Sequence, residues 1–118
     1  MILGIGVDVV HLERFRTRLE ATPALRERLF VPSERETSPE SLAARFAAKE
    51  AVIKAMGGPV GTWHDVWIES AAHGAPALRF GGAVAEHLAA RGVESAHVSL
   101  SHDGPVATAF VILEGASS

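Results

Sequence analysis

The spacing of hydrophobic and polar residues changes several times along the chain. Four segments repeat their apolar residues every three or four positions, which is typical of amphipathic helices. Five other segments are short runs rich in β-branched residues, which predict strands. The predicted helices cover 11–20, 23–30, 39–56 and 82–92, and the predicted strands cover 2–10, 64–70, 75–80, 95–102 and 106–114.

Residues that start and stop regular structure lie at the ends of these segments. Ser-Pro at 38–39 begins the longest helix, and Gly-Gly-Pro at 57–59 ends it. The sequence AAHG at 71–74 and Asp-Gly at 103–104 each join two strands as a hairpin. The polar connection before the longest helix fits one further helical turn, with a capping-box spacing at 33–36.

The order of elements predicts the fold class. A strand, several helices, two strands, a helix and two more strands indicate an α+β protein with a largely antiparallel sheet packed on helices. With 118 residues the chain can build one core but not two, so we expect a single domain over 1–118.

Composition narrows the class of protein further. A hydrophobic content of 47% and a charged content of 21% are ordinary for a soluble globular protein. The net charge of −3 argues against a nucleic-acid-binding protein, and the absence of cysteine excludes disulfides, thiolate catalysis and cysteine-based metal sites. The N-terminus has no basic leader, and the apolar run at 106–113 is too short to span a membrane. We therefore expect a cytoplasmic protein that contacts no membrane.

The first predicted strand carries one acid, Asp8. Side chains alternate along a strand, so Asp8 shares a face with Gly4 and Gly6. Glycine in a strand often marks a place where a ligand or another backbone comes close. Two interpretations stay open: Asp8 holds a metal in a cleft, or it accepts backbone hydrogen bonds at a strand end.

The longest helix carries an unexpected set of charges. Lys49 falls within an apolar stripe, where its head group could still extend to water. Glu50 and Lys54 share a second row with two alanines, so a ligand or a strand could approach them closely. The alternatives are an ordinary exposed ion pair, or a phosphate site in which Glu50 joins Asp8 on Mg²⁺ and Lys54 meets phosphate oxygens. Arg45 could add a forked contact to another phosphate.

A third group of polar residues lies where the strand at 95–102 turns back. Ser101, His102 and Asp103 are consecutive, so they cannot form a catalytic triad within one strand. The histidines show no zinc-ligand spacing. A turn in which Asp103 bonds its own backbone is the alternative to a functional role.

Three segments in this order resemble the holo-acyl-carrier-protein synthases, which are small bacterial phosphopantetheinyl transferases. They are GIGVDVVHLERF, RFAAKEAVIKAMGG and HVSLSHDGPVATAFVILE, at 4–15, 45–58 and 97–114. Gly74 and Pro76 also match the family's Gly-x-Pro segment between strands. The chain departs from many members at Val7, where they have a hydroxyl residue, and in its short polar connection before the longest helix.

The resemblance implies the 4′-phosphopantetheinyl transferase fold and a reaction. The phosphopantetheine arm of coenzyme A would move to a serine of an acyl carrier protein, releasing adenosine 3′,5′-bisphosphate and supporting fatty acid biosynthesis. Asp8 and Glu50 match the family's metal-binding acids, with Mg²⁺ on the diphosphate. Glu50, directly or through a metal-bound water, is the first candidate for accepting the serine proton. Lys54 would contact phosphate or the leaving group.

The resemblance also implies an assembly. Family members are trimers with sites between neighbouring chains, so His102 of one copy would complete a site whose Asp8 belongs to another. Ser101, His102 and Asp103 match the family's strand end, with roles in coenzyme placement or proton handling that the sequence does not separate.

A basic cluster in the first two predicted helices has two interpretations. It is either a solvated surface or a docking surface for an acidic partner. Family members dock the acidic acyl carrier protein with the first helix, which implies a partner contact at Arg14, and also at Arg18 and Arg26.

Two other functions fit the same residues. A magnesium-dependent hydrolase of nucleotide diphosphates could use the same acids and lysine. A coenzyme-binding or assembly module could keep the fold without the activity.

Overall fold

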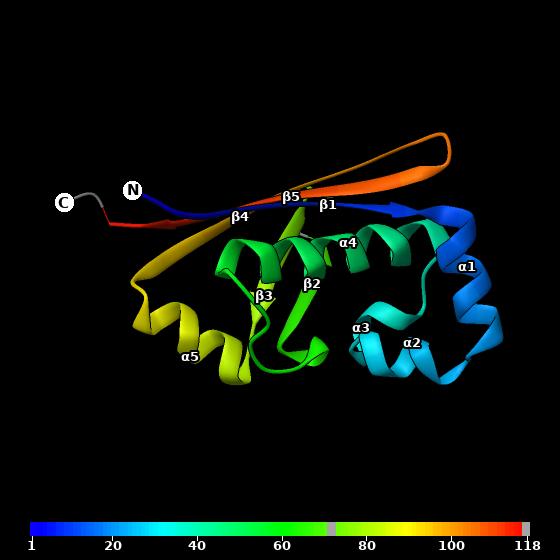
Figure 1. The fold of residues 1–118 in the computed structure, drawn as a ribbon, viewed down its shortest axis with the longest axis horizontal. Coiled ribbons are helices and arrows are strands. Elements are labelled where there is room, and N and C mark those ends of the chain that lie inside the picture. Colours follow the sequence, from blue (N-terminus) through cyan, green and yellow to red (C-terminus); the bar gives the residue numbers. More distant parts are fainter. Residues whose placement is uncertain (71–72, 117–118) are drawn as a thin grey trace.

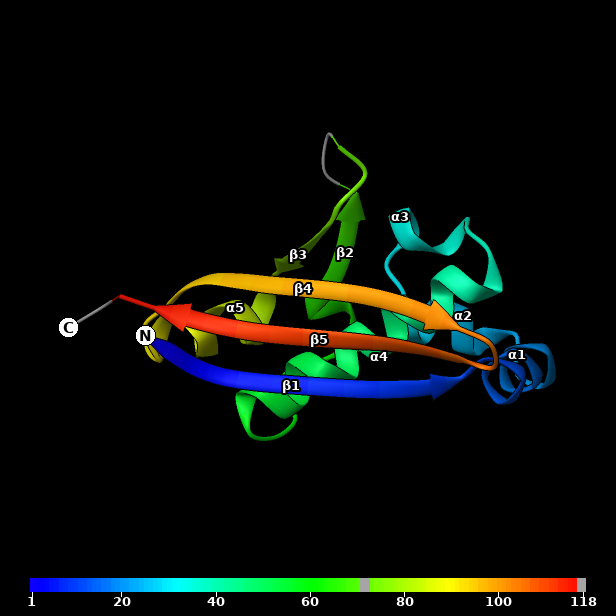
Figure 2. The same cartoon turned by 90° about the horizontal axis from the view of Figure 1, so that it is seen from above.

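The computed structural model describes residues 1–70 and 73–116. Strands β1 (Ile2–His11), β5 (Val106–Gly115) and β4 (Val93–Asp103) form an antiparallel sheet in the order β1-β5-β4. Strands β2 (Val66–Ser70) and β3 (Pro76–Phe80) form a separate antiparallel pair. Seen from above, the three long strands lie side by side, and β2 and β3 extend away from them (Figure 2).

The helices lie on one side of the three-stranded sheet (Figure 1). The longest, α4, runs beneath the sheet, and the others lie below or beside it. The helices are α1 (Leu12–Ala21), α2 (Ala24–Leu29), α3 (Pro32–Arg35), α4 (Pro39–Met56) and α5 (Gly82–Ala90), with a 3₁₀ turn η1 at Trp63–Asp65.

The predicted α+β class, the antiparallel sheet and the bounds of α4 are confirmed. The 103–104 turn joins β4 to β5 as expected, whereas part of the predicted AAHG connection, 71–72, lies outside the described residues. The capping box predicted at 33–36 is wrong. The turn α3 begins at Pro32, and Glu34 rather than Glu36 accepts a hydrogen bond from the backbone N–H of Val31 (3.2 Å).

The alanine row of α4 is its most deeply buried face. Ala43, Ala47 and Ala51 are fully buried, and a Cβ atom at Gly4 or Gly6 of β1 would overlap the carbonyl oxygens of α4. The glycines therefore let a helix backbone approach the strand, which was one of the two alternatives. The other alternative, open space for a ligand at these glycines, is wrong.

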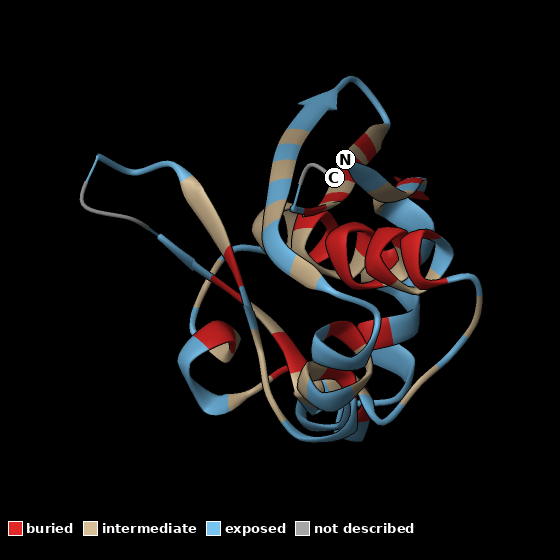
Figure 3. Cartoon of the chain, turned by 90° about the vertical axis from the view of Figure 1, so that its left-hand side faces the viewer, coloured by how far each residue is buried: buried red, intermediate tan, exposed pale blue. Residues whose placement is uncertain are grey.

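β1 is buried on only one of its faces. Gly6 and Val10 are buried against the helices, but Ile5, Val7 and Val9 are 54%, 50% and 60% exposed. Figure 3 shows that buried residues run along α4. The opposite sheet face carries exposed apolar side chains on β1 and β5 and polar ones on β4.

Within the described residues, no helix combines the length and the apolar character needed to cross a membrane.

Candidate active site

Asp8 lies on the helix-facing side of β1, opposite Ala109 of β5. Its side chain is 18% exposed, and its carboxylate accepts a hydrogen bond from Lys54 Nζ at 3.0 Å. Its backbone carbonyl accepts a second bond, from Thr108 Oγ1 at 2.9 Å. The strand pairing and the lysine together hold this carboxylate at the edge of the contact between β1 and α4.

Glu50 reaches the same place from α4. It lines a pocket of about 310 Å³ with Asp8, Phe46, Arg14 and other residues of β1 and α1. Burial raises the pKa of Glu50, and the negative charge of Asp8 raises it further, while Lys54 acts in the opposite direction. The structure thus brings together the two predicted metal-binding acids, and their charges repel each other.

Lys54 bridges β1 and α4 with its head group at the surface. Its Nζ donates to the backbone carbonyl of Val7 and to Asp8 Oδ1, both at 3.0 Å, and its side chain is 55% exposed. Among the ion pairs of the described residues Lys54 therefore pairs with Asp8 and not with Glu50. The ordinary helical Glu50–Lys54 pair, one of the alternatives from the sequence, does not form.

The acids could hold a hard divalent cation. Residues 1–70 and 73–116 contain no group of three or more His, Cys, Asp or Glu arranged for a metal. Two carboxylates can still supply two oxygen ligands to Mg²⁺, which usually keeps several waters and takes phosphate oxygens as further ligands.

The strand end at Ser101, His102 and Asp103 is exposed and lies apart from the two acids. His102 pairs with Ala107 of β5, which in turn pairs with Val10, so two strand spacings separate the His102 backbone from β1. That is about 10 Å. A single chain therefore does not bring His102 to Asp8, and the turn interpretation stays open for one copy.

The predicted partner-binding arginines divide into two groups. Arg14 and Arg18 are exposed on α1 and line the pocket of the two acids. Arg26 lies elsewhere and donates from Nη1 to the backbone carbonyl of Arg35 at 3.0 Å. The position of Arg14 and Arg18 beside the candidate site is the arrangement that a docking surface would need.

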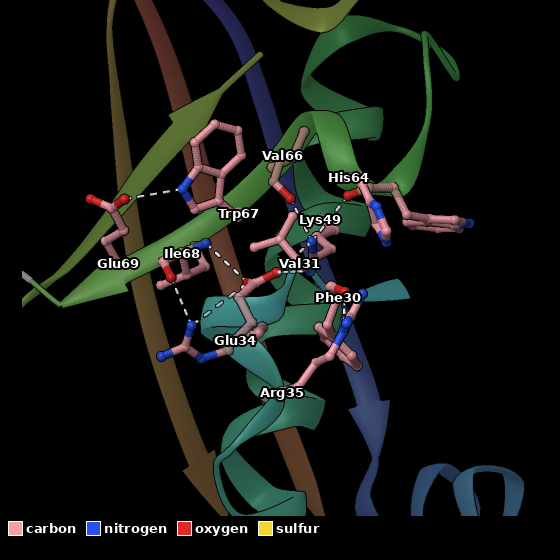
Figure 4. A network of polar contacts seen from close by, with 12 residues as sticks. Phe30, Val31, Glu34, Arg35, Lys49, His64, Val66, Trp67, Ile68 and Glu69 are labelled. Atoms are coloured by element: carbon pink, nitrogen blue, oxygen red, sulfur yellow. Dashed lines mark hydrogen bonds and ion pairs between the residues drawn. The ribbon is translucent and has the colours of Figure 1, made fainter. Parts of the chain in front are cut away.

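The buried ion pair between Glu34 and Lys49 was not predicted from the sequence. Both residues are 1% exposed, and Lys49 Nζ lies 2.9 Å from Glu34 Oε1 (Figure 4). The ammonium group also donates to the carbonyls of Trp63 and Val66. The expectation that Lys49 extends to water is therefore wrong. The position of Lys49 inside the apolar stripe is a signal of this pair, but its partner Glu34 lies in the segment that the sequence predicts to be a polar connection.

Lys49 and Arg45 belong to this network rather than to the pocket of Asp8 and Glu50. Burial lowers the pKa of Lys49, and Glu34 opposes that shift. Arg45 Nη1 donates to the carbonyl of Ile68 at 2.7 Å and lies 3.7 Å from Glu34 Oε2. The phosphate contact expected of Arg45 stays a prediction.

A model of the 4′-phosphopantetheinyl transferase superfamily matches residues 4–111. The holo-[acyl-carrier-protein] synthase of Kocuria rhizophila is 57% identical over 97% of this chain and 94% of its own length. That of Clavibacter sepedonicus is 58% identical over 98% of both chains.

Solved structures agree in fold. The holo-[acyl-carrier-protein] synthase of Neisseria meningitidis superposes with a TM-score of 0.89 at 31% identity, covering 97% of this chain and 99% of that one. The enzyme of Helicobacter pylori, in complex with coenzyme A, gives 0.83 at 28% identity, covering 93% and 99%. Together with the family match, these likenesses show that the chain belongs to the 4′-phosphopantetheinyl transferase superfamily, within which it is a transferase of the holo-[acyl-carrier-protein] synthase type.

Proposed function

We propose that the chain transfers 4′-phosphopantetheine from coenzyme A to a serine of an apo acyl carrier protein, releasing adenosine 3′,5′-bisphosphate. The observation that carries the proposal is the meeting of Asp8 and Glu50 in one pocket, with Lys54 on Asp8. Relatives named holo-[acyl-carrier-protein] synthase and a neighbour in complex with coenzyme A support it. The modified carrier protein would serve fatty acid biosynthesis.

Mg²⁺ is the proposed cofactor, held by Asp8 and Glu50. The donor set fits, because carboxylate oxygens are hard ligands and two of them suit an ion whose other positions water and phosphate fill. The raised pKa of Glu50, caused by burial and by Asp8, means that a cation would relieve an existing repulsion. When bound, Mg²⁺ would neutralise charge that builds up on the diphosphate.

Glu50 and Lys54 would handle the proton and the negative charge of the transfer. The serine oxygen bonds to the phosphorus that carries pantetheine, and the bond from that phosphorus to the bridging oxygen breaks. Glu50 would take the serine proton as the general base. Lys54, with its exposed head group, would donate to phosphate oxygens.

Arg45 would bind the third phosphate group, the 3′-phosphate of coenzyme A. Arg45 lies five residues before Glu50 on α4, which is about 140° around the helix. Two side chains so far apart face different parts of a substrate, or different substrate molecules. Because Arg45 has a forked guanidinium, it suits a phosphate with several terminal oxygens.

A trimer is the proposed assembly, with the site completed between copies. The open sheet face exposes Ile5, Val7, Val9 and Phe110, and exposed apolar patches of this kind often mark a protein interface. In that arrangement Ser101, His102 and Asp103 of one copy would place coenzyme A over the acids of the next. Sedimentation equilibrium tests this, because a monomer at micromolar concentration would reject the trimer.

The decisive experiment is modification of apo acyl carrier protein with coenzyme A and Mg²⁺, followed by mass spectrometry. We expect one phosphopantetheine group per acceptor serine and release of the bisphosphate only when the carrier is present. Release without the carrier would instead indicate a nucleotide-diphosphate hydrolase. Coenzyme binding with neither product would indicate a binding module.

Arg14→Glu should raise the KM for the carrier protein about tenfold and leave the KM for coenzyme A within about twofold. Arg14 is exposed beside the pocket, so reversing its charge repels an acidic partner, and the penalty should shrink as salt is added. Steady-state kinetics at two ionic strengths measure this. Arg28→Glu, an exposed arginine on α2, is the matched control. An unchanged carrier KM in a folded Arg14 variant would remove α1 from the docking surface.

A further inference from the structure

One edge of β2 is closed by charged side chains instead of by another strand. β2 pairs with β3 along its other edge. On the open side, Lys49 donates to the carbonyl of Val66, Glu34 accepts from the N–H of Ile68 at 3.0 Å, and Arg45 donates to the carbonyl of Ile68. Figure 4 shows Glu34 pointing between Lys49 and Ile68. Residues of α3 and α4 thus fasten the hairpin to the core.

Glu34 is the centre of this arrangement. Its side chain is fully buried, with Oε1 near Lys49 and the backbone N–H of Val31, and Oε2 near Ile68 and Arg45. A buried carboxylate is stable only when such partners satisfy it, so its place is fixed from four sides. Glu34 therefore presents a fixed negative charge to Arg45.

Arg45 uses only one part of its guanidinium for these contacts. Nη1 makes both the bond to Ile68 and the ion pair with Glu34. In the hydrogen bonds of the described residues, Nε and Nη2 of Arg45 donate to no protein group. The side chain is 15% exposed, so part of it remains open to solvent. A planar guanidinium held at one nitrogen keeps a second edge for a two-point contact with phosphate.

We propose that Glu34 is a positioning residue for the substrate's phosphate. It holds the Nη1 end of Arg45 inward, so that the Nε–Nη2 edge of the fork stays directed at the ligand. The inference rests on the proposed function, in which Arg45 takes the 3′-phosphate. Glu34 itself does not touch the substrate. Its contribution is to order a long side chain before binding, which reduces the entropy lost when the phosphate arrives.

Kinetics of the full chain test this role, with coenzyme A varied at saturating apo carrier protein. Glu34→Gln keeps an oxygen that can accept from the backbone N–H of Ile68, but it removes the negative charge that faces Arg45. The variant should therefore have a KM for coenzyme A about tenfold higher than that of native protein. We expect kcat and the carrier KM to stay within about twofold. Because Glu34→Gln also leaves Lys49 without its counter-charge, the same change is made together with Lys49→Met.

Two comparisons separate positioning from a general loosening of the fold. Arg45→Ala should raise the KM for coenzyme A at least as much, and adding Glu34→Gln to it should change the KM no further. With coenzyme A that lacks the 3′-phosphate, native protein and Glu34 variants should have equal KM values. Glu69→Gln, an exposed acid on the same hairpin, is the control and should leave every constant unchanged.

A KM for coenzyme A equal to that of native protein in the Glu34 variants would overturn the proposal. The proposal would also be overturned if adding Glu34→Gln to Arg45→Ala raised this KM by the same factor as Glu34→Gln does alone. The failure of both Glu34 variants to fold would overturn it as well, because Glu34 would then serve the fold alone. If native protein transfers no phosphopantetheine, the proposed function fails first. Calorimetric titration with coenzyme A then tests the role of Glu34 separately. If the Glu34 variants bind coenzyme A with the same affinity as native protein, Glu34 does not position Arg45 for the phosphate.

Discussion

Asp8→Ala and Glu50→Ala should each lower kcat/KM for carrier modification by about a thousandfold or more, which is roughly 4 kcal/mol of transition-state stabilisation. Each change removes one of two protein ligands for the proposed cation. Glu50→Ala also removes the proposed proton acceptor. Both residues lie at the rim of the contact between β1 and α4, not at its centre, so the variants should remain folded.

Stability measurements without substrate give an independent check on the same site. The folded-state pKa of Glu50 lies above its unfolded value of 4.5, so folding favours its protonated form. That contribution is fully present below about pH 4.5 and is lost as pH rises through the raised pKa. Metal-free Glu50→Gln should therefore have a higher Tm than native protein at neutral pH.

Addition of Mg²⁺ should reverse that order. Native protein should gain thermal stability with Mg²⁺, because a ligand that binds only the folded state stabilises it, while Glu50→Gln and Asp8→Asn should gain little. Glu86→Gln, an exposed acid on α5, should behave as native protein does. Equal stabilisation of all four proteins by Mg²⁺ would contradict a cation site at Asp8 and Glu50.

Lys49→Met should destabilise the protein by about 3–5 kcal/mol. The change removes the ammonium group that lies 2.9 Å from buried Glu34 and leaves Arg45, at 3.7 Å, as the remaining cation, and removal of one partner of a buried ion pair typically costs that much. The carbonyls of Trp63 and Val66 also lose a donor. Urea denaturation followed by circular dichroism measures the effect.

Adding Glu34→Gln to Lys49→Met should recover part of the lost stability. The double variant no longer buries a carboxylate that has lost its lysine partner, and its amide oxygen can still accept from the backbone N–H of Ile68. Arg16→Met, which breaks an exposed pair with Glu40, should cost less than about 1 kcal/mol and serves as the control. A double variant less stable than Lys49→Met alone would show that the ion pair is not what stabilises this region.

The periodic parts of the chain could be predicted from the sequence. The bounds of α4 followed from its apolar spacing and from the proline and glycines at its ends, because these signals are local. Asp8 and Glu50 were identified by residue type and by resemblance, and the structure brings them together. The proximity of Asp8 and Glu50 could not be deduced from their separation along the sequence, because it depends on how β1 crosses α4.

The remaining features depend on long-range contacts. Lys49 was placed correctly in an apolar stripe, but only the folded chain shows that a glutamate fifteen residues earlier meets it. The two glycines of β1 indicated a close approach without saying what approaches. The helical period also left open whether a ligand or a strand approaches the small alanine side chains of α4, and in the structure the sheet covers them.

The contact between β1 and α4 at Gly4 and Gly6 has a consequence for how the acids are spaced. The backbones of β1 and α4 are in direct contact there, so we expect the two elements that carry the carboxylates to hold a fixed relative position. A cation would meet oxygens assembled during folding, and little freedom would be left to lose on its arrival. A bulkier residue at either glycine would wedge the helix outward, and affinity for the cation would fall although neither acid had changed.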